Sequence, residues 1–194
     1  MTAYDATTAL IVVDVQNDFA DRGGSLYVRG AEEAVLAIVE EIAAARATGA
    51  TVVYTQDWHP PVTPHFEKDG GIWPVHCVEN TWGAAFHPGL PHAPEIVRKG
   101  VDGSDGYSGF SVRDPTTGET APTPLVDILR AHGIERLVVC GLATDYCVVE
   151  TVVDARMLGY PVQVLGDGIR AVDLAEGDGE RAITRMRDAG AEVA

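Results

Sequence analysis

Three side chains of the types used in nucleophilic catalysis follow strand-like segments at widely separated points of the chain. Asp14 and Lys99 each end such a segment, and Cys147 follows a third one by a few residues. The carboxyl ends of parallel strands meet at one edge of a sheet, so these side chains could converge there. A thiolate nucleophile needs a proton acceptor and a nearby cation, which aspartate and lysine provide. The combination favours a cysteine-based catalytic site over the alternative, in which Asp14 caps a turn and Lys99 is a solvated surface lysine.

The sequence around the cysteine is consistent with a strand, a break and a helix. Residues 137–140 form an apolar, β-branched run, Gly141 interrupts it, and Thr144 and Asp145 are typical helix N-cap residues. We therefore expect Cys147 in the first turn of a helix, just beyond the edge of a sheet. The N–H groups and dipole of a helix N-terminus stabilise an anion, which predicts a lowered thiol pKa. The alternative is that Cys147 is a buried, inert cysteine.

A second cluster of candidate residues follows the predicted strand 51–55. Asp57 and His59 are two residues apart, so in an extended segment they point to the same face, and His65 and His76 follow nearby. One carboxylate and three imidazoles form a ligand set suited to zinc, iron or manganese. The alternative is that these histidines are ordinary polar residues of a surface loop.

Aromatic residues flank both groups of candidates. Phe19 follows Asp14, Trp73 precedes His76, and Tyr107 follows Lys99. These rings could form the walls of a site for a flat ring substrate, although each could equally be loop packing. The chain contains no P-loop, no GxSxG elbow and no well-placed dinucleotide fingerprint, which argues against ATP or NAD chemistry.

The predicted elements alternate between strand and helix, as the convergence of the candidates requires. Strands are predicted over 9–13, 51–55, 95–99, 137–140 and 162–165, with a short edge strand at 192–193. Helices are predicted over 31–48, 124–133 and 176–188 and from residue 147 to Gly159, while the long segments 56–94 and 100–118 are irregular. This alternation predicts one α/β domain over residues 1–194. We expect a doubly wound, Rossmann-like three-layer sandwich with a central, mainly parallel sheet.

Composition narrows the class of partner. The 194 residues are 46% apolar and 22% charged, and 29 acidic against 14 basic residues give a formal net charge of −15. Such a field repels phosphate backbones and anionic lipid surfaces, so we expect neither nucleic-acid nor membrane binding. The start of the chain lacks a signal-like segment, which predicts a cytoplasmic protein. In that reducing compartment Cys77, Cys140 and Cys147 should be free thiols.

Taken together, these residues resemble the nicotinamidase branch of the isochorismatase-like cysteine hydrolases. The matching pieces, in the order of that family, are VDVQNDF around Asp14, QDWH, PHF, WPVHC, RKG at Lys99, YSGF and GLATDYCV at Cys147. They span most of the chain. The resemblance implies an isochorismatase-like hydrolase fold and an Asp–Lys–Cys triad formed by Asp14, Lys99 and Cys147.

The resemblance also implies an activity, namely hydrolysis of nicotinamide to nicotinate and ammonia within NAD salvage. The Cys147 thiolate would form a thioester, Asp14 would transfer protons, and backbone N–H groups of Ala143 and Cys147 would hold the oxyanion. Pyrazinamide and other small aromatic carboxamides are expected to be related substrates. The competing interpretations are a hydrolase of the same family acting on another amide or carbamoyl compound, and a metal-binding scaffold without turnover.

By the same resemblance, one divalent metal ion would be held by Asp57, His59, His65 and His76. Zinc is the first expectation, and iron and manganese accept the same ligands. The implied substrate pocket comprises Phe19, Trp73, Tyr107, Leu142 and Ala143, with a cis peptide bond between Leu142 and Ala143. Members of this family often self-associate, so a homo-oligomer is also compatible with the resemblance.

Overall fold

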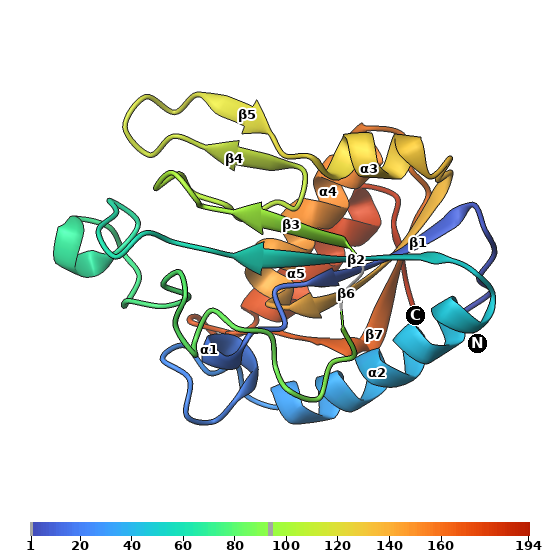
Figure 1. Cartoon of the computed structure of the whole chain (residues 1–194), viewed down its shortest axis with the longest axis horizontal. Helices are drawn as coiled ribbons and strands as arrows, with labels where there is room; N and C mark the ends of the chain where they lie inside the picture. Colours follow the sequence, from blue (N-terminus) through green and yellow to red (C-terminus); the bar gives the residue numbers. More distant parts are fainter. Residues whose placement is uncertain (1, 93–94) are drawn as a thin grey trace.

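The computed structural model describes residues 2–92 and 95–194 and is built around one six-stranded sheet (Figure 1). Every neighbouring pair in this sheet is parallel. In spatial order the strands are β3 (Glu95–Lys99), β2 (Thr51–Asp57), β1 (Thr8–Val13), β6 (Arg136–Leu142), β7 (Val162–Arg170) and β8 (Glu192–Val193). The order reverses on either side of β1, as in a doubly wound fold, which confirms the predicted α/β class.

Helices cover both faces of the sheet, which gives three layers (Figure 1). On one face lie α2 (Ala31–Ala47) and the short α1 (Asn17–Ala20); on the other lie α3 (Leu125–Ala131), α4 (Val149–Met157) and α5 (Asp178–Asp188). Strand β1 is buried on both sides, because Leu10 and Val12 pack in the core beneath α2 while Ile11 and Val13 pack towards α3–α5. The uninterrupted apolar run of this strand is typical of a central parallel strand.

The predicted elements are largely confirmed, and the differences have local causes. Strand β7 continues to Arg170 although the apolar run ends at Leu165, because its backbone pairs again with β6 beyond a shift of register. The helix predicted to begin at Cys147 starts instead as a π-helical turn, η2 (Thr144–Val148), and continues as α4.

The long segments contain short elements that the sequence does not predict. Strands β4 (Ser111–Arg113) and β5 (Thr120–Pro122) form a two-stranded antiparallel hairpin, and η1 (Glu67–Asp69) is one 3-10 turn. Residues 93 and 94, the last of the predicted irregular segment 56–94, lie outside the described residues.

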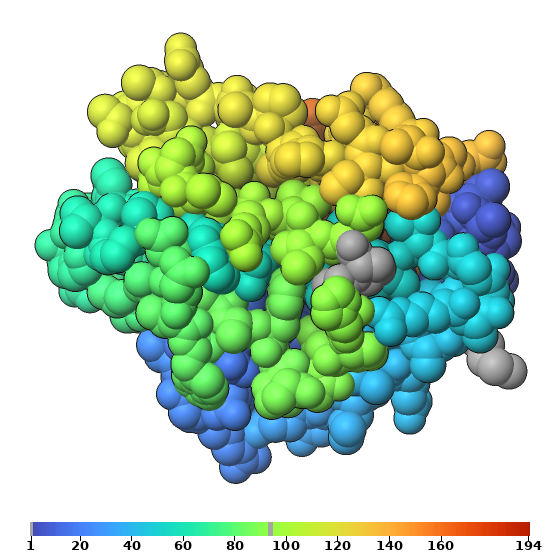
Figure 2. All heavy atoms as spheres, in the orientation of Figure 1, coloured from blue at the N-terminus to red at the C-terminus, as the bar shows by residue number. Residues whose placement is uncertain are grey.

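The loop after β2 covers the carboxyl edge of the sheet together with the segment that follows β1. Figure 2 shows the green segment around residues 70–90 against the blue segment of residues 20–30. Several hydrogen bonds join the loop after β2 to the segment that follows β1. Among them, Asn17 Nδ2 donates to Trp82 O at 2.8 Å and Cys77 N donates to Asp18 Oδ2 at 2.7 Å. Two loops that are distant in sequence thus enclose the region where β1, β2 and β3 end.

All three cysteines are free thiols, as predicted, and all three are buried. Among the helices of the described residues, none is both long and apolar enough to cross a lipid bilayer.

Candidate active site

The ends of three neighbouring strands bring one ammonium group and two carboxylates into contact. Asp14 follows β1, Asp57 ends β2 and Lys99 ends β3. Lys99 Nζ lies 2.7 Å from Asp14 Oδ2 and 3.0 Å from Asp57 Oδ1, and it also donates to the Gly106 carbonyl. The alternative of a solvated surface lysine is therefore wrong, because the Lys99 side chain has no exposure at all.

Burial and pairing set the charges of this cluster. Burial alone would lower the pKa of Lys99, but Asp14 and Asp57 raise that pKa well above its ordinary value. Burial would raise the pKa of Asp57, yet Lys99 and His59 hold it well below its usual range. For Asp14 burial prevails, and its pKa rises to about 6 against the opposing effect of Lys99. The cluster thus contains a fixed cation, a fixed anion and a carboxylate that can accept a proton near neutrality.

Cys147 lies in the π-helical turn beyond the end of β6, with its side chain beside both carboxylates. Its Sγ and the nearest carboxylate oxygens of Asp14 and Asp57 all lie within 4.8 Å of one another. The expectation of a lowered thiol pKa is wrong for this structure. Burial raises the pKa of Cys147 well above its ordinary value, Lys99 opposes this, and the nearby Asp14 and Asp57 carboxylates raise the pKa further. The resting side chain is accordingly a thiol beside a proton acceptor.

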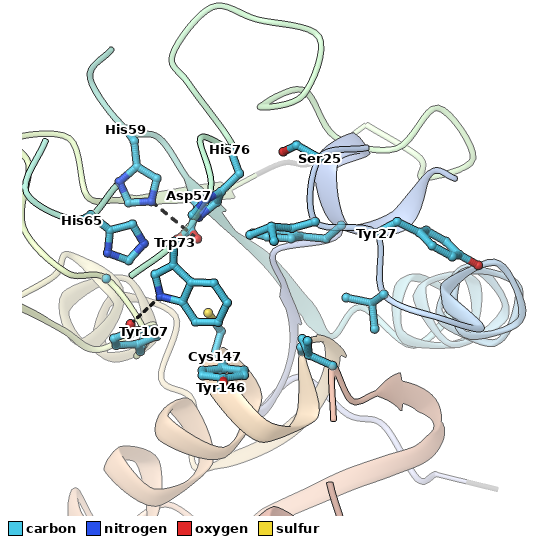
Figure 3. A pocket seen from close by; sticks show the side chains of 16 residues that line it. Ser25, Tyr27, Asp57, His59, His65, Trp73, His76, Tyr107, Tyr146 and Cys147 are labelled. Atoms are coloured by element: carbon cyan, nitrogen blue, oxygen red, sulfur yellow. Dashed lines mark hydrogen bonds and ion pairs between the residues drawn. The ribbon is translucent and has the colours of Figure 1, made fainter. Parts of the chain in front are cut away.

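The three predicted histidines form a second cluster, next to the first. One ring nitrogen of each of His59, His65 and His76 lies within 4.8 Å of the other two, and the three side chains are buried, so the surface-loop alternative is wrong. Asp57 lies between the clusters, because its Oδ2 is 3.8 Å from His59 Nε2 (Figure 3). Its Oδ1 contacts Lys99.

The histidine cluster has the donors and the unmet polar atoms that a divalent cation would satisfy. Both ring nitrogens of His59 are buried without a hydrogen-bond partner in the described chain, which is costly unless a ligand binds there. Burial lowers the pKa of His65, and that of His76 to about 4, which favours the neutral imidazoles that bind metals. The donor set therefore fits zinc, and iron and manganese equally. The Asp14–Asp57–Cys147 group, in contrast, already holds the Lys99 ammonium.

A cavity of about 240 Å³ borders both clusters. Cys147 and the histidines line it, and so do Phe19, Trp73, Tyr107 and Ala143 of the predicted pocket. Figure 3 shows the Trp73 indole beside the imidazoles, with its nitrogen towards Tyr107. Its Nε1 donates to the Tyr107 hydroxyl at 2.8 Å, which fixes the indole plane.

Leu142, also predicted for the pocket, is absent from the cavity wall formed by the described residues. Its side chain is 1% exposed and packs in the core beneath α2. The predicted cis peptide bond between Leu142 and Ala143 is present.

Several residues that shape the site are not apparent from the sequence. Thr55 Oγ1 donates to Asp14 Oδ1 at 2.6 Å across the β1–β2 pair. Gln16 holds the main chain of Asp57 at both ends, since its Nε2 donates to Asp57 O at 2.7 Å and its Oε1 accepts from Asp57 N at 2.8 Å. Tyr146 completes the aromatic wall, edge-on to Trp73 at 4.8 Å. Thr55 could have been found from the parallel register, which places the end of the second strand beside that of the first.

A doubly wound parallel sheet with a thiol, a carboxylate and an ammonium group at its carboxyl edge defines the class of this protein: it is an α/β enzyme of the hydrolase type. More narrowly, the chain belongs to the isochorismatase family, because the model of the isochorismatase domain matches residues 8–194.

The known proteins similar to this chain align with nearly its whole length. Nicotinamidase of Escherichia coli (strain K12) is 39% identical over 95% of this chain and 93% of its own. The crystal structure of pyrazinamidase of Pyrococcus horikoshii in complex with zinc is 38% identical, with a TM-score of 0.86 over 97% of this chain and 98% of that chain. The crystal structure of PnC1 from L. infantum in complex with nicotinate is 35% identical, with a TM-score of 0.87 over 100% of this chain and 95% of that chain.

Proposed function

We propose that this enzyme hydrolyses nicotinamide to nicotinate and ammonia, and that it accepts pyrazinamide as well. The observation that carries the proposal is the position of Cys147, which lies beside the Lys99-bound carboxylate of Asp14 and lines the same cavity as the three histidines. The nicotinamidase and pyrazinamidase relatives support this choice of substrate. The reaction would be one step in the salvage of NAD.

In this mechanism Cys147 is the nucleophile and Asp14 moves the protons. Asp14 takes the thiol proton as Sγ attacks the carboxamide carbon, and it gives that proton to the departing ammonia when the carbon–nitrogen bond breaks. The resulting thioester is hydrolysed by a water molecule that Asp14 deprotonates, which releases nicotinate and restores the thiol. Lys99 remains charged throughout and stabilises the negative charge that passes between Sγ and Asp14.

The negative oxygen formed during each attack requires hydrogen-bond donors in place beforehand. We assign this role to the backbone N–H groups of Ala143 and Cys147, two residues that line the cavity. Such preorganised donors act on the transition state, so they accelerate the reaction without tightening substrate binding.

The histidine cluster and Asp57 would hold one divalent metal ion, and zinc is the first candidate because a similar pyrazinamidase is known in complex with zinc. When bound, the metal would supply a Lewis acid that orients the ring nitrogen of the substrate. The side chains of Phe19, Trp73 and Tyr107 would then enclose the flat ring.

The decisive experiment is to measure ammonia release from nicotinamide and from pyrazinamide by the purified protein, with its metal content determined on the same samples. The parent should turn over both amides and Cys147→Ala neither. Cys140→Ala is the matched control, because Cys140 is a buried thiol that packs beneath α2 in the core. Turnover of a carbamoyl compound, with none of nicotinamide, would overturn the substrate assignment in favour of the alternative hydrolase. Equal activity of the parent and Cys147→Ala would overturn the mechanism.

A further inference from the structure

A carboxylate outside the predicted site contacts one of the three histidines. Asp105 Oδ1 lies 2.7 Å from His65 Nδ1, within hydrogen-bonding distance, although the two residues are far apart in the sequence. The His65 side chain is 6% exposed and that of Asp105 is 24% exposed, so the contact lies at the inner end of a loop rather than on the open surface.

The main chain holds Asp105 in place independently of its side chain. Asp105 N donates to Arg113 O at 2.7 Å, and Arg113 N donates back to Asp105 O at 2.8 Å. Arg113 ends β4, so the hairpin β4–β5 acts as a support for the loop that follows β3. The backbone position from which the Asp105 carboxylate contacts His65 is therefore fixed by the hairpin.

The contact determines which nitrogen of the ring faces the cluster. An imidazole that donates its Nδ1 proton to an acceptor presents Nε2 as an unprotonated ligand atom. His76 has the same arrangement, with its Nδ1 2.8 Å from the carbonyl oxygen of Pro74. His59 has no such partner in the described chain. Hydrogen bonds to Nδ1 therefore orient two of the three rings.

We propose that Asp105 is a positioning residue of the histidine cluster, which fixes the tautomer and the plane of His65 so that Nε2 is available to a divalent cation. The inference rests on the proposed function in one respect, namely that the cluster binds metal. It gives the hairpin β4–β5 a role, because the hairpin determines the place of Asp105. It also predicts that changes in this surface hairpin alter metal affinity at a distance.

The test measures zinc affinity of metal-free protein by competition with a chromophoric chelator, for the parent, Asp105→Ala and Asp105→Asn. Asp105→Ala should weaken zinc binding by about tenfold to a hundredfold, as is usual when an outer hydrogen-bond partner of a ligand is lost. Asp105→Asn should lose less, because an amide oxygen still accepts a hydrogen bond from Nδ1. Circular dichroism and thermal unfolding of the metal-free proteins should be unchanged.

The matched control is Asp102→Ala. Asp102 lies on the same loop, but its carboxylate accepts hydrogen bonds from Ser104 (2.6 Å from its Oγ) and is not bonded to His65. This variant should bind zinc within about twofold of the parent, a change too small to resolve from ordinary surface effects.

The outcomes separate this inference from the proposed function. Unchanged zinc affinity in Asp105→Ala would overturn the inference alone, as would an equal loss in Asp102→Ala. If Asp105→Ala does not fold, Asp105→Leu decides, because it keeps a side chain of similar size without a hydrogen-bond acceptor, and parental zinc affinity in that variant would then overturn the inference. A parent that binds no zinc would overturn both the inference and the metal site of the proposed function. If Asp105→Ala binds zinc as tightly as the parent and still releases ammonia, the inference fails while the proposed function stands.

Discussion

Lys99 Nζ lies 2.7 Å from Asp14 Oδ2, and neither side chain has any exposure to solvent. The same ammonium lies 3.0 Å from Asp57 Oδ1, so one cation holds two carboxylates that come from two other strands. Lys99 ends β3, the edge strand of the sheet, yet its charge is wholly interior. We therefore expect stability and chemistry to depend on the same side chain.

Replacing Lys99 by methionine should destabilise the fold as well as abolish amide hydrolysis. The variant leaves two buried carboxylates without their cation, and breaking a buried pair in this way costs about 3–5 kcal/mol. The free energy of unfolding from urea titrations measures the loss. Arg98→Met is the control, because Arg98 is an exposed cation on the same strand that stacks on Trp58 at 3.9 Å and should cost about 1 kcal/mol. Equal losses for both variants would contradict the prediction.

Removing the hydroxyl of Thr55 should move the acidic limb of the pH–rate profile. Asp14 must be ionised to accept the thiol proton, and burial raises its pKa to about 6 while the hydrogen bond from Thr55 lowers it. In Thr55→Val that stabilisation of the carboxylate is lost, so the Asp14 pKa rises further and activity falls at a higher pH than in the parent.

The comparison is between profiles of kcat/KM for nicotinamide in the parent, Thr55→Val and Thr55→Ser. The serine variant retains a hydroxyl and should keep the parental limb. If the acidic limb of the profile lies at the same pH in Thr55→Val as in the parent, Asp14 is not the proton acceptor.

Stripping the metal should inactivate the enzyme reversibly. Treatment with a chelator should abolish ammonia release, because in the proposed mechanism the metal orients the substrate ring. Added zinc should restore the activity. His59→Ala should not retain stoichiometric metal, whereas His132→Ala, whose side chain is 45% exposed, should. Full turnover by stripped protein, with metal analysis confirming its absence, would refute this prediction.

Gly141 is predicted to be irreplaceable for folding. Its φ is +119°, and an added Cβ would lie 2.1 Å from the carbonyl oxygen of Val13 in the neighbouring strand. Gly141→Ala should therefore destabilise the protein by several times the cost of Gly49→Ala. Gly49 also has positive φ, but no atom lies near its added Cβ, so that variant should cost only about 1–2 kcal/mol. Thermal unfolding of the two variants would show the difference, and similar midpoints would contradict it.

The parts of the fold that could be predicted are those in which burial imposes a recognisable pattern of apolar residues. Strand β3 runs from Glu95 to Lys99 as expected, and β1 and α2 follow their apolar patterns closely. The second half of β7 escaped prediction because Gly166 and Gly168 interrupt the apolar run while backbone pairing continues. The hairpin β4–β5 escaped because its residues are largely exposed and show no alternation.

In the candidate site, residue types and strand ends were enough to predict which side chains meet. They did not predict how Asp57 is shared between Lys99 and His59, since that depends on the separate placement of its two oxygens. Nor did they indicate Asp105, whose contact with His65 joins two loops of irregular backbone. The lowered pKa expected for Cys147 was wrong because the helix-end argument did not include the burial of the thiol beside two carboxylates.

The indole of Trp73 provides an intrinsic fluorescence probe of the cavity. It is 6% exposed, hydrogen-bonded to Tyr107 and stacked towards His65, whereas Trp82 is 55% exposed and Trp58 lies beneath a guanidinium group. Emission from the buried indole will therefore be resolved at shorter wavelengths than that of Trp82 and will change when an aromatic amide or a cation enters the cavity. Occupancy of the cavity can thus be followed in real time, without a label and without turnover.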